Sequence, residues 1–209
     1  MTLMKGASLV AALVVQFAAS GAALASSDSF MVTSGRATQP VGHYDFCQTR
    51  PIECKQMTAR AKPIALTRAL WSEIVAVNNR VNTQVTPRTD MEIWGREEVW
   101  SYPVNSVGDC EDYVLEKRRL LIKAGIPAGN LLITVVKQPN GDGHAVLTVN
   151  TDRGDFVLDN LDGRVLVWTE TPYTYLKRQS AKNSGAWVSI NDGRAVAVGS
   201  VPDRRQAGV

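Results

Sequence analysis

Three residues of this 209-residue sequence could together perform nucleophilic catalysis: Cys110, His144 and Asp159. A cysteine thiolate attacks carbonyl carbon, a histidine can take up the thiol proton, and a carboxylate can hold the imidazole in the tautomer that this transfer requires. The combination predicts hydrolysis of an acyl bond through a thioester intermediate. The three residues are far apart in the sequence, so the prediction depends on the elements that bring them together.

Cys110 is the cysteine left over from a predicted disulfide. The chain has three cysteines, and Cys47 and Cys54 are close enough in sequence, with Pro51 between them, for the loop to close on itself. The economical pairing is Cys47–Cys54, which leaves Cys110 unpaired. A leftover thiol in an exported protein suggests a chemical role, whereas burial as an inert side chain is the alternative fate. The cysteine count alone does not decide between the two.

The local sequence places Cys110 in the first turn of a predicted helix over 109–123, which Gly125 and Pro127 end. The N–H groups and dipole of a helix N-terminus favour a thiolate. Three acidic neighbours act in the opposite direction: Asp109, Glu111 and Asp112. A histidine cation near the sulfur would therefore help to form an ion pair.

His144 is one of only two histidines in the sequence. It follows a glycine-containing turn at 139–143 and opens a predicted strand at 145–149, from where it could face a cleft. The alternative is an exposed turn histidine. His43 lies in an irregular N-terminal segment and is predicted to be a surface or packing residue.

Strand parity selects Asp159 as the partner of His144. Two strands joined by a short even loop pair so that opposed positions sum to an odd number, and odd-numbered residues of the second strand then share a face with His144. Asp159 has the right parity and lies at the near end. Asp155 lies at the far end, and Asn160 points to the other face unless the loop is odd or bulged. A strand-end aspartate bonded to loop N–H groups is the structural alternative.

Two helices are predicted in the sequence before Cys110. Apolar residues at helical spacing predict a helix over 63–82 that Pro63 opens. Thr89 and Glu92 form a capping-box pattern for a short second helix that Gly95 would end. Two aromatic residues near it are predicted to be core or cleft-wall residues: Trp94 and Trp100.

After the helix at 109–123 the periodicity changes to that of strands. Short β-type runs separated by turn sequences predict an antiparallel meander. The predicted strands are 131–136, 145–149, 155–158 and 165–168, with a further strand at 186–190. Helices followed by such a sheet indicate an α+β fold rather than a doubly wound one.

The N-terminal sequence resembles a signal peptide. Lys5, an apolar stretch at 7–19 and the small-x-small pattern Ala23–Leu24–Ala25 predict cleavage near Ala25/Ser26 and a periplasmic or secreted product. An uncleaved N-terminal anchor is the alternative. No stable membrane span is expected. We expect residues 1–25 to be the signal peptide, 26–45 an extended segment, 46–190 the peptidase domain and 191–209 a loose tail.

The composition excludes classes of protein without choosing a function. A hydrophobic fraction of 44% and a charged fraction of 21% are ordinary for a soluble globular domain. The net charge is +3, and the chain has no long run of lysine or arginine. No nucleic-acid partner is therefore expected. The sequence carries no signal for an oligomeric state.

Three segments resemble the signatures of the bacterial transglutaminase-like cysteine proteinases. They are Gly108–Tyr113 around the cysteine, Gly141–Val146 around the histidine and Val157–Asn160 around the aspartate. The similarity extends over about 44–190 and includes the Cys47–Cys54 segment. It implies a papain-like, transglutaminase-like fold, in which the nucleophile opens a core helix packed on an antiparallel sheet. It also implies a thiol peptidase that hydrolyses peptide bonds of a protein substrate.

One branch of this family comprises periplasmic proteases that cut large surface adhesins and need calcium beside the active site. The resemblance thus implies a protein substrate outside the cytoplasm, an adhesin in that branch. The acids that match the calcium ligands are Asp109, Glu111 and Asp112. Carboxylate oxygens suit calcium, but three acids so close in one helix cannot all aim at one point. An acidic helix N-terminus is also stabilising without metal. The chemistry itself requires no cofactor.

Two other functions use the same residues. The acyl group could pass to an amine, which would make the protein a cross-linking transglutaminase, and residue types do not separate this from hydrolysis. A non-catalytic binding module on the same fold is the second alternative, although all three catalytic residue types are present. A zinc site is disfavoured because no pair of ligands has zinc-type spacing.

Overall fold

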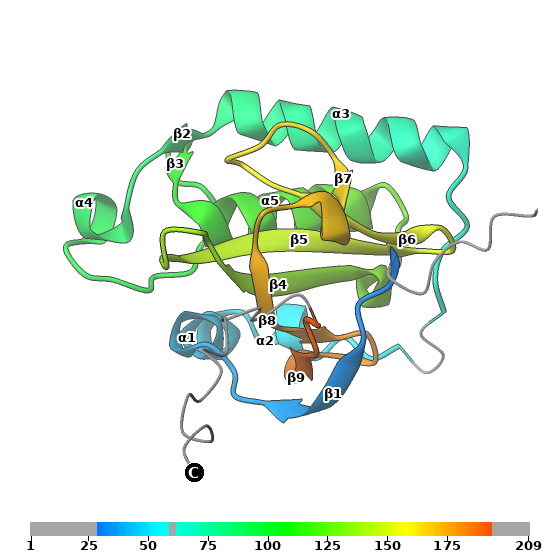
Figure 1. The fold of residues 1–209 in the computed structure, drawn as a ribbon. Coiled ribbons are helices and arrows are strands. Elements are labelled where there is room, and N and C mark those ends of the chain that lie inside the picture. Colours follow the sequence, from blue (N-terminus) through cyan, green and yellow to red (C-terminus); the bar gives the residue numbers. More distant parts are fainter. Residues whose placement is uncertain (1–28, 59–61, 194–209) are drawn as a thin grey trace, which may run out of the picture.

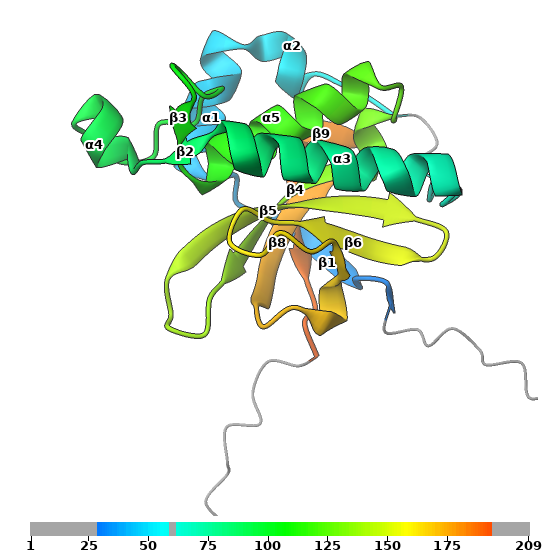
Figure 2. The same cartoon turned by 90° about the horizontal axis from the view of Figure 1, so that it is seen from above.

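A seven-stranded antiparallel sheet with helices on one face forms the fold, within residues 29–58 and 62–193 that the computed structural model describes (Figure 1, Figure 2). The elements are β1 Thr33–Ala37, α1 Val41–Thr49, α2 Pro51–Cys54, α3 Arg68–Gln84, β2 Thr86–Pro87, α4 Asp90–Trp94, β3 Val107–Gly108, α5 Cys110–Lys123, β4 Leu131–Lys137, β5 Gly143–Thr151, β6 Gly154–Leu158, β7 Leu166–Val167, β8 Thr174–Ser180 and β9 Asn183–Ile190. This is the predicted α+β architecture, in which α5 opens at the cysteine and packs on the sheet.

The strand order is β1-β9-β8-β4-β5-β6-β7. Strands β4 to β7 are successive neighbours, as the predicted meander requires. The chain then returns to the other side of β4, where β8 pairs with it, and β9 and β1 complete the sheet. The sequence did not reveal β8, because it combines buried Tyr175 and Arg178 with exposed Leu176 and does not show plain apolar alternation.

Helix α3 begins at Arg68, not at Pro63 as predicted. The Thr67 hydroxyl caps the helix by accepting from the Leu70 N–H at 3.1 Å. The preceding backbone is engaged elsewhere, because the Ile64 N–H donates to the Asn150 carbonyl at 3.2 Å beside β5. The residues before Arg68, which periodicity predicted to be helical, therefore pair with β5 instead.

The short helix α4 forms with the predicted capping box. The Thr89 hydroxyl accepts from the Glu92 N–H at 3.3 Å, and the Glu92 carboxylate accepts from the Thr89 N–H at 2.9 Å. Gly95 ends the helix in the left-handed conformation, with φ 69°. Trp94 is 43% exposed, so the prediction that it is a core or cleft-wall residue is wrong, whereas Trp100 is buried.

A two-residue parallel ladder joins the end of α3 to the start of α5. Strand β2 follows α3 directly and pairs with β3, which directly precedes α5. The Thr86 N–H donates to the Ser106 carbonyl at 2.8 Å, and the Arg88 N–H to the Gly108 carbonyl at 3.0 Å. The ladder places the end of α3 beside the start of α5, so the two packed helices run antiparallel. Residues 88–106 form an excursion that leaves the fold at this ladder and returns to it there.

The main core lies between the helices and the sheet. Its buried residues come chiefly from α3, α5, β4 and β5 and include Ile74, Val77, Val81, Val114, Leu121, Leu131, Ile133, Leu147 and Val149. Alternate residues of the strands face the other side of the sheet, where a second cluster contains Val136, Val146, Val157, Trp168 and Tyr175. Both faces of β4 and β5 are thus buried, which fixes their register.

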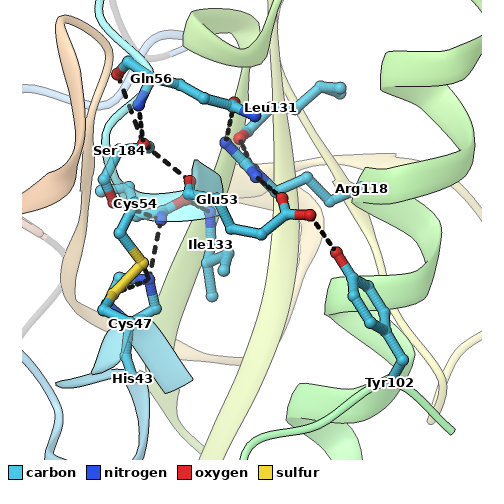
Figure 3. Close-up of polar contacts among 11 residues, drawn as sticks. His43, Cys47, Glu53, Cys54, Gln56, Tyr102, Arg118, Leu131, Ile133 and Ser184 are labelled. Atoms are coloured by element: carbon cyan, nitrogen blue, oxygen red, sulfur yellow. Dashed lines mark hydrogen bonds and ion pairs between the residues drawn. A yellow bond between two sulfur atoms is a disulfide. The ribbon is translucent and has the colours of Figure 1, made fainter. Parts of the chain in front are cut away.

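The predicted Cys47–Cys54 disulfide is present and joins α1 to α2 (Figure 3). Beside it, His43 is a buried packing residue: the Trp187 indole N–H donates to its Nδ1 at 3.2 Å, and Gln179 lies 3.2 Å from its Nε2. Burial, followed by the charge of Arg118, lowers the pKa of His43 to about 4. The imidazole is therefore neutral at physiological pH.

A buried polar network connects α2, α5 and β9 next to this disulfide (Figure 3). Arg118 donates to the Leu131 carbonyl at 3.0 Å and to Gln56 at 3.3 Å, and its guanidinium lies 3.9 Å from Glu53. The Ser184 hydroxyl donates to the Glu53 carbonyl at 2.9 Å. These bonds fix α1 and α2 against the sheet.

The first part of the fold differs from the expected extended segment at 26–45. It contributes β1, which pairs with β9, and the first turn of α1. The fold therefore begins before residue 46. The predicted signal peptide at 1–25 and all but 191–193 of the predicted tail lie outside the described residues. Within those residues, no helix combines the length and apolarity needed to cross a bilayer.

Gly42 lets α1 lie directly against Trp100, and this contact can be tested. A Cβ at Gly42 would meet Trp100 Cδ1 at 2.2 Å. We expect Gly42→Ala to overpack this contact and to lower the free energy of unfolding by about 1–3 kcal/mol in urea denaturation. Gly163→Ala is the matched control, because a Cβ there meets nothing within 4 Å. Equal stabilities of the two variants would contradict this packing.

Candidate active site

Cys110 is the first residue of α5, with Asp109 as N-cap. Its thiol is half-buried and donates to Glu111 Oε2 at 2.7 Å. Burial raises the pKa of Cys110 well above its ordinary value, and the charge and hydrogen bond of Glu111 add to this, while a hydrogen bond from the Ala145 N–H lowers it. In this arrangement the sulfur keeps its proton.

His144 and Asp159 meet at the ends of β5 and β6. Opposed residues such as Leu147 and Leu158 sum to an odd number, which is the register that the parity argument assumed. His144 Nε2 lies 2.8 Å from Asp159 Oδ1, and both side chains are buried. Asp155, the rejected alternative, binds Arg178 at 3.1 Å instead.

Asp159 is held by three further donors. The Tyr173 hydroxyl donates to its Oδ2, the Leu161 N–H donates to its Oδ1 at 3.0 Å, and the Asn82 amide donates to its backbone carbonyl at 2.7 Å. Burial alone would raise the pKa of Asp159, but the hydrogen bond and charge of His144, with the bonds from Tyr173 and Leu161, lower it below the ordinary value. Asp159 is therefore an anion at neutral pH.

These supporting residues were not found by sequence reasoning. Tyr173 follows a 3₁₀ turn between β7 and β8, and Asn82 lies on α3. Neither belongs to a motif around the aspartate. The sequence offered one indication, a polar Asn82 close to the apolar face of a predicted helix. This indication does not show which residue Asn82 binds.

A cleft of ≈ 540 Å³ contains both Cys110 and His144. Its walls come from the start of α1, the start of α5 and the strands β4, β5 and β8. The other lining residues are Pro40, Val41, Glu98, Trp100, Glu111, Val135, Gly143, Ala145 and Lys177. Trp100 is thus a cleft-wall residue, as predicted.

Asp109 and Asp112 converge with an acid that the sequence analysis missed. One carboxylate oxygen each of Asp90, Asp109 and Asp112 lie within 4.8 Å of one another. Glu111, predicted as a third ligand, does not join them, because its carboxylate is turned to the Cys110 thiol. Asp90 replaces it from α4, a helix that is remote in sequence but is brought alongside by the excursion of residues 88–106.

The cluster of Asp90, Asp109 and Asp112 lacks positive charge. Burial, then the charges of Glu111, Asp90 and Asp112, raises the pKa of Asp109 to about 9. Burial also raises the pKa of Asp112 to about 7 and raises that of Asp90. Oδ1 of Asp90 and of Asp109 are buried with no hydrogen-bond partner in the described part of the chain. The donor set fits a hard cation that prefers oxygen ligands.

Comparisons with known proteins also indicate a cysteine proteinase. A family model described as bacterial transglutaminase-like cysteine proteinase BTLCP matches residues 33–195. The chain is similar to the calcium-bound LapG of Legionella pneumophila, with 26% identity and a TM-score of 0.50 over 57% of this chain and 68% of LapG. An EGTA-treated form of the same LapG gives 26% identity and a TM-score of 0.49 over 57% and 67%. A comparison with curated proteins finds no match.

The bond from Tyr173 to Asp159 gives a pH-dependent prediction. Because the pKa of Asp159 is lowered in the fold, its stabilising contribution is present above the unfolded value and is lost as pH falls through the folded one. Tyr173→Phe should therefore lower the free energy of unfolding by about 1–3 kcal/mol at neutral pH and by less in acid. Urea denaturation at the two pH values measures the difference.

Tyr175→Phe is the matched control for this experiment. The Tyr175 hydroxyl lies 2.9 Å from that of Thr171, which is an uncharged partner. Its removal should cost the same at both pH values. If Tyr173→Phe behaved in the same way, Asp159 would not be the charged acceptor that the geometry indicates.

Proposed function

Because the chain belongs to the bacterial transglutaminase-like cysteine proteinase family and is a cysteine peptidase, we propose that Cys110, His144 and Asp159 are its catalytic residues. The buried His144–Asp159 contact of 2.8 Å, beside the same cleft as the Cys110 thiol, carries the proposal. A carboxylate that orients an imidazole next to a thiol at a helix N-terminus is the arrangement that nucleophilic catalysis by cysteine needs.

The hydrogen bond to Asp159 assigns the two nitrogens of His144. Neutral imidazole carries one N–H, and with Nε2–H donated to Asp159 the lone pair is on Nδ1. Nδ1 therefore takes the thiol proton once the thiol turns from Glu111. The thiolate attacks the substrate carbonyl, and the backbone N–H of Cys110 at the helix start helps to stabilise the oxyanion. The imidazolium then protonates the leaving amine.

Hydrolysis of the resulting thioester completes the reaction. Water loses a proton to His144 and attacks the thioester carbonyl, which releases the acid and the thiol. Transfer to an amine acceptor would use the same residues, and family membership supports water. The proposed substrate is a protein outside the cytoplasm, an adhesin of the kind cut by the branch that the motifs resemble. The signal-like residues 1–25 and the Cys47–Cys54 disulfide support export, because disulfides persist in oxidising compartments.

The proposed function is tested by comparing the cell-surface proteins of cells that carry the wild-type chain with those of cells that carry Cys110→Ala. We expect a large surface protein to be shortened only with wild type. Asp159→Asn should lower the cleavage rate by about 10⁴-fold, as the same change of the orienting carboxylate does in serine peptidases. Asp162→Asn, which changes a half-buried acid paired with Arg164, is the control and should cleave normally.

A labelled amine in the same assay separates the two acyl acceptors. Cleavage without incorporation is the expected result for a hydrolase. Amine incorporation into a glutamine-containing protein without cleavage would overturn the peptidase proposal in favour of cross-linking. Cleavage by Cys110→Ala equal to wild type would remove the nucleophile from the proposal.

We further propose that the cluster of Asp90, Asp109 and Asp112 holds calcium. The two buried, unpartnered Oδ1 atoms and the converging carboxylates support this, and a LapG of similar fold is calcium-bound. A bound Ca²⁺ would supply positive charge that offsets the carboxylates around Cys110. The protein itself contributes the buried position of the three acids and the bonds from Val99 and Ser101 N–H that orient Asp90 and Asp112.

Calcium binding should depend on pH in a defined direction. The raised pKa values mean that the calcium-free fold binds extra protons, so its stability falls as pH rises from about 4 through about 7 and about 9. Protons and cation compete for the same oxygens. Calcium should therefore raise the melting temperature more near pH 8 than near pH 5. At about 100 Kd, calcium binding adds up to about 2.7 kcal/mol to the free energy of unfolding.

Asp90→Asn provides the test of the site itself. Thermal melts with calcium and with EGTA should show a much smaller calcium effect in Asp90→Asn than in wild type, and Asp162→Asn should retain the full effect. An undiminished calcium effect in Asp90→Asn, or none in wild type, would contradict the assignment.

A further inference from the structure

Lys117 occupies a core position of α5. It follows Cys110 by two helical turns, about 10 Å along the axis, in the stripe that also contains Val114 and Leu121. Its side chain is 0% exposed, and within the described residues its Nζ has no hydrogen-bond partner. The nearest aromatic contact is the Tyr113 ring, with its centroid 5.8 Å from Nζ. A buried ammonium group without a partner is costly, so its position needs an explanation.

The antiparallel packing of α3 on α5 determines what faces Lys117. The Tyr113 hydroxyl donates to the carbonyl of Val85, at the end of α3. One turn further along α5 corresponds to one turn back along α3. That step brings Lys117 to the level of Asn82, and Asn78 lies one further turn back on the inner side of α3. Asn78 is fully buried.

These asparagines hold the loop that begins with Asp159. The Asn82 amide donates to the Asp159 carbonyl at 2.7 Å, and the Asn78 amide donates to the Gly163 carbonyl at 3.0 Å. Their Oδ1 atoms, and Oδ1 of Asn160 in the same loop, are buried acceptors with no partner in the described part of the chain. An ammonium group has three N–H donors and no acceptor. The unpartnered donor and the unpartnered acceptors are therefore complementary.

Charge connects Lys117 to the same loop. Burial lowers the pKa of Lys117 to about 7, and the negative charge of Asp159 raises it. Asp159 is the charged group that acts on Lys117 in the described residues. Helix α3 faces it with uncharged asparagines, and Tyr113 on its own helix is hydrogen-bonded to Val85.

We propose that Lys117 is a positioning residue for Asp159. Its ammonium group donates through bound water to the asparagine oxygens of Asn78, Asn82 and Asn160, and its charge favours the anionic form of Asp159. Lys117 touches no reacting atom and acts through the Asp159–His144 pair. The inference rests on the proposed catalytic role of that pair, but not on the identity of the substrate.

The test compares wild type with Lys117→Met, which keeps the shape and removes the charge. The chain has only two histidines, so imidazole NMR signals can be assigned with a His43 variant. Loss of a nearby positive charge should move the pH midpoint of the His144 signal upward by about 0.5 unit. The melting temperature should fall as well, because the buried asparagine oxygens lose their donor and the Asp159 carboxylate loses a counter-charge, so the midpoint and not the stability decides the role.

Leu121→Ala, one turn further along the same stripe, is the matched control. It should lower the melting temperature and leave the His144 midpoint unchanged. An unchanged midpoint in Lys117→Met, or an equal shift in Leu121→Ala, would overturn the proposal. Because the NMR titration needs no substrate, it decides the role of Lys117 even if the chain cleaves nothing.

A reciprocal measurement covers the case in which Lys117→Met does not fold. Coupling between two charges is mutual, so Asp159→Asn should lower the midpoint of the Lys117 side-chain NMR titration. The same midpoint in wild type and Asp159→Asn would show that the two groups do not interact and would overturn the proposal.

Discussion

The pairing register of β5 with β6 is the constraint on which the site depends. The register that opposes Leu147 to Leu158 places His144 and Asp159 on one face at neighbouring strand ends. A slip of one residue would turn Asp159 away from the imidazole and move Val146 and Val157 out of their core. The apolar residues on both faces of β5 thus secure the geometry of a polar pair that contributes few apolar contacts of its own.

Helix α5 combines hydrophobic packing with an unusual number of buried charges. Glu111, Asp112, Lys117 and Arg118 are all buried on it. Three of them are held by hydrogen bonds to different surroundings: Glu111 to the Cys110 thiol, Asp112 to the Ser101 backbone and Arg118 to the β4 backbone. Lys117 interacts with Asp159 through charge. Apolar side chains would stabilise such positions more simply. Glu111, Asp112 and Lys117 therefore set the electrostatic environment of the proposed catalytic and acidic groups, whereas Arg118 holds α2 against the sheet.

Much of this fold could be predicted from local patterns, and the failures have physical causes. The capping box of α4, the start of α5 at Cys110 and the meander β4–β7 depend on nearby residues and agree with prediction. The start of α3 and the strand β8 depend on pairing with distant segments. In the site, strand parity predicted that His144 and Asp159 share a face. Asp90 and Tyr173 are brought to the acidic cluster and to Asp159 by loops, and no periodicity in the sequence predicts the path of a loop. Glu111 was predicted to join Asp109 and Asp112 as a ligand, but its carboxylate is turned to the Cys110 thiol. The position of a residue in a helix does not specify its rotamer.

The β2–β3 ladder closes residues 88–106 into an excursion with both ends at one point. This segment supplies Glu98 and Trp100 to the cleft wall and Asp90 to the acidic cluster. Closure entropy grows only slowly with loop length, so insertions in this segment that keep Asp90, Trp100 and Ser101 would leave the nucleophile in place. Related enzymes would change their choice of substrate by exchanging the remaining residues of this segment, which include part of the cleft wall. Grafting residues 88–106 from a relative is therefore a direct route to engineered specificity.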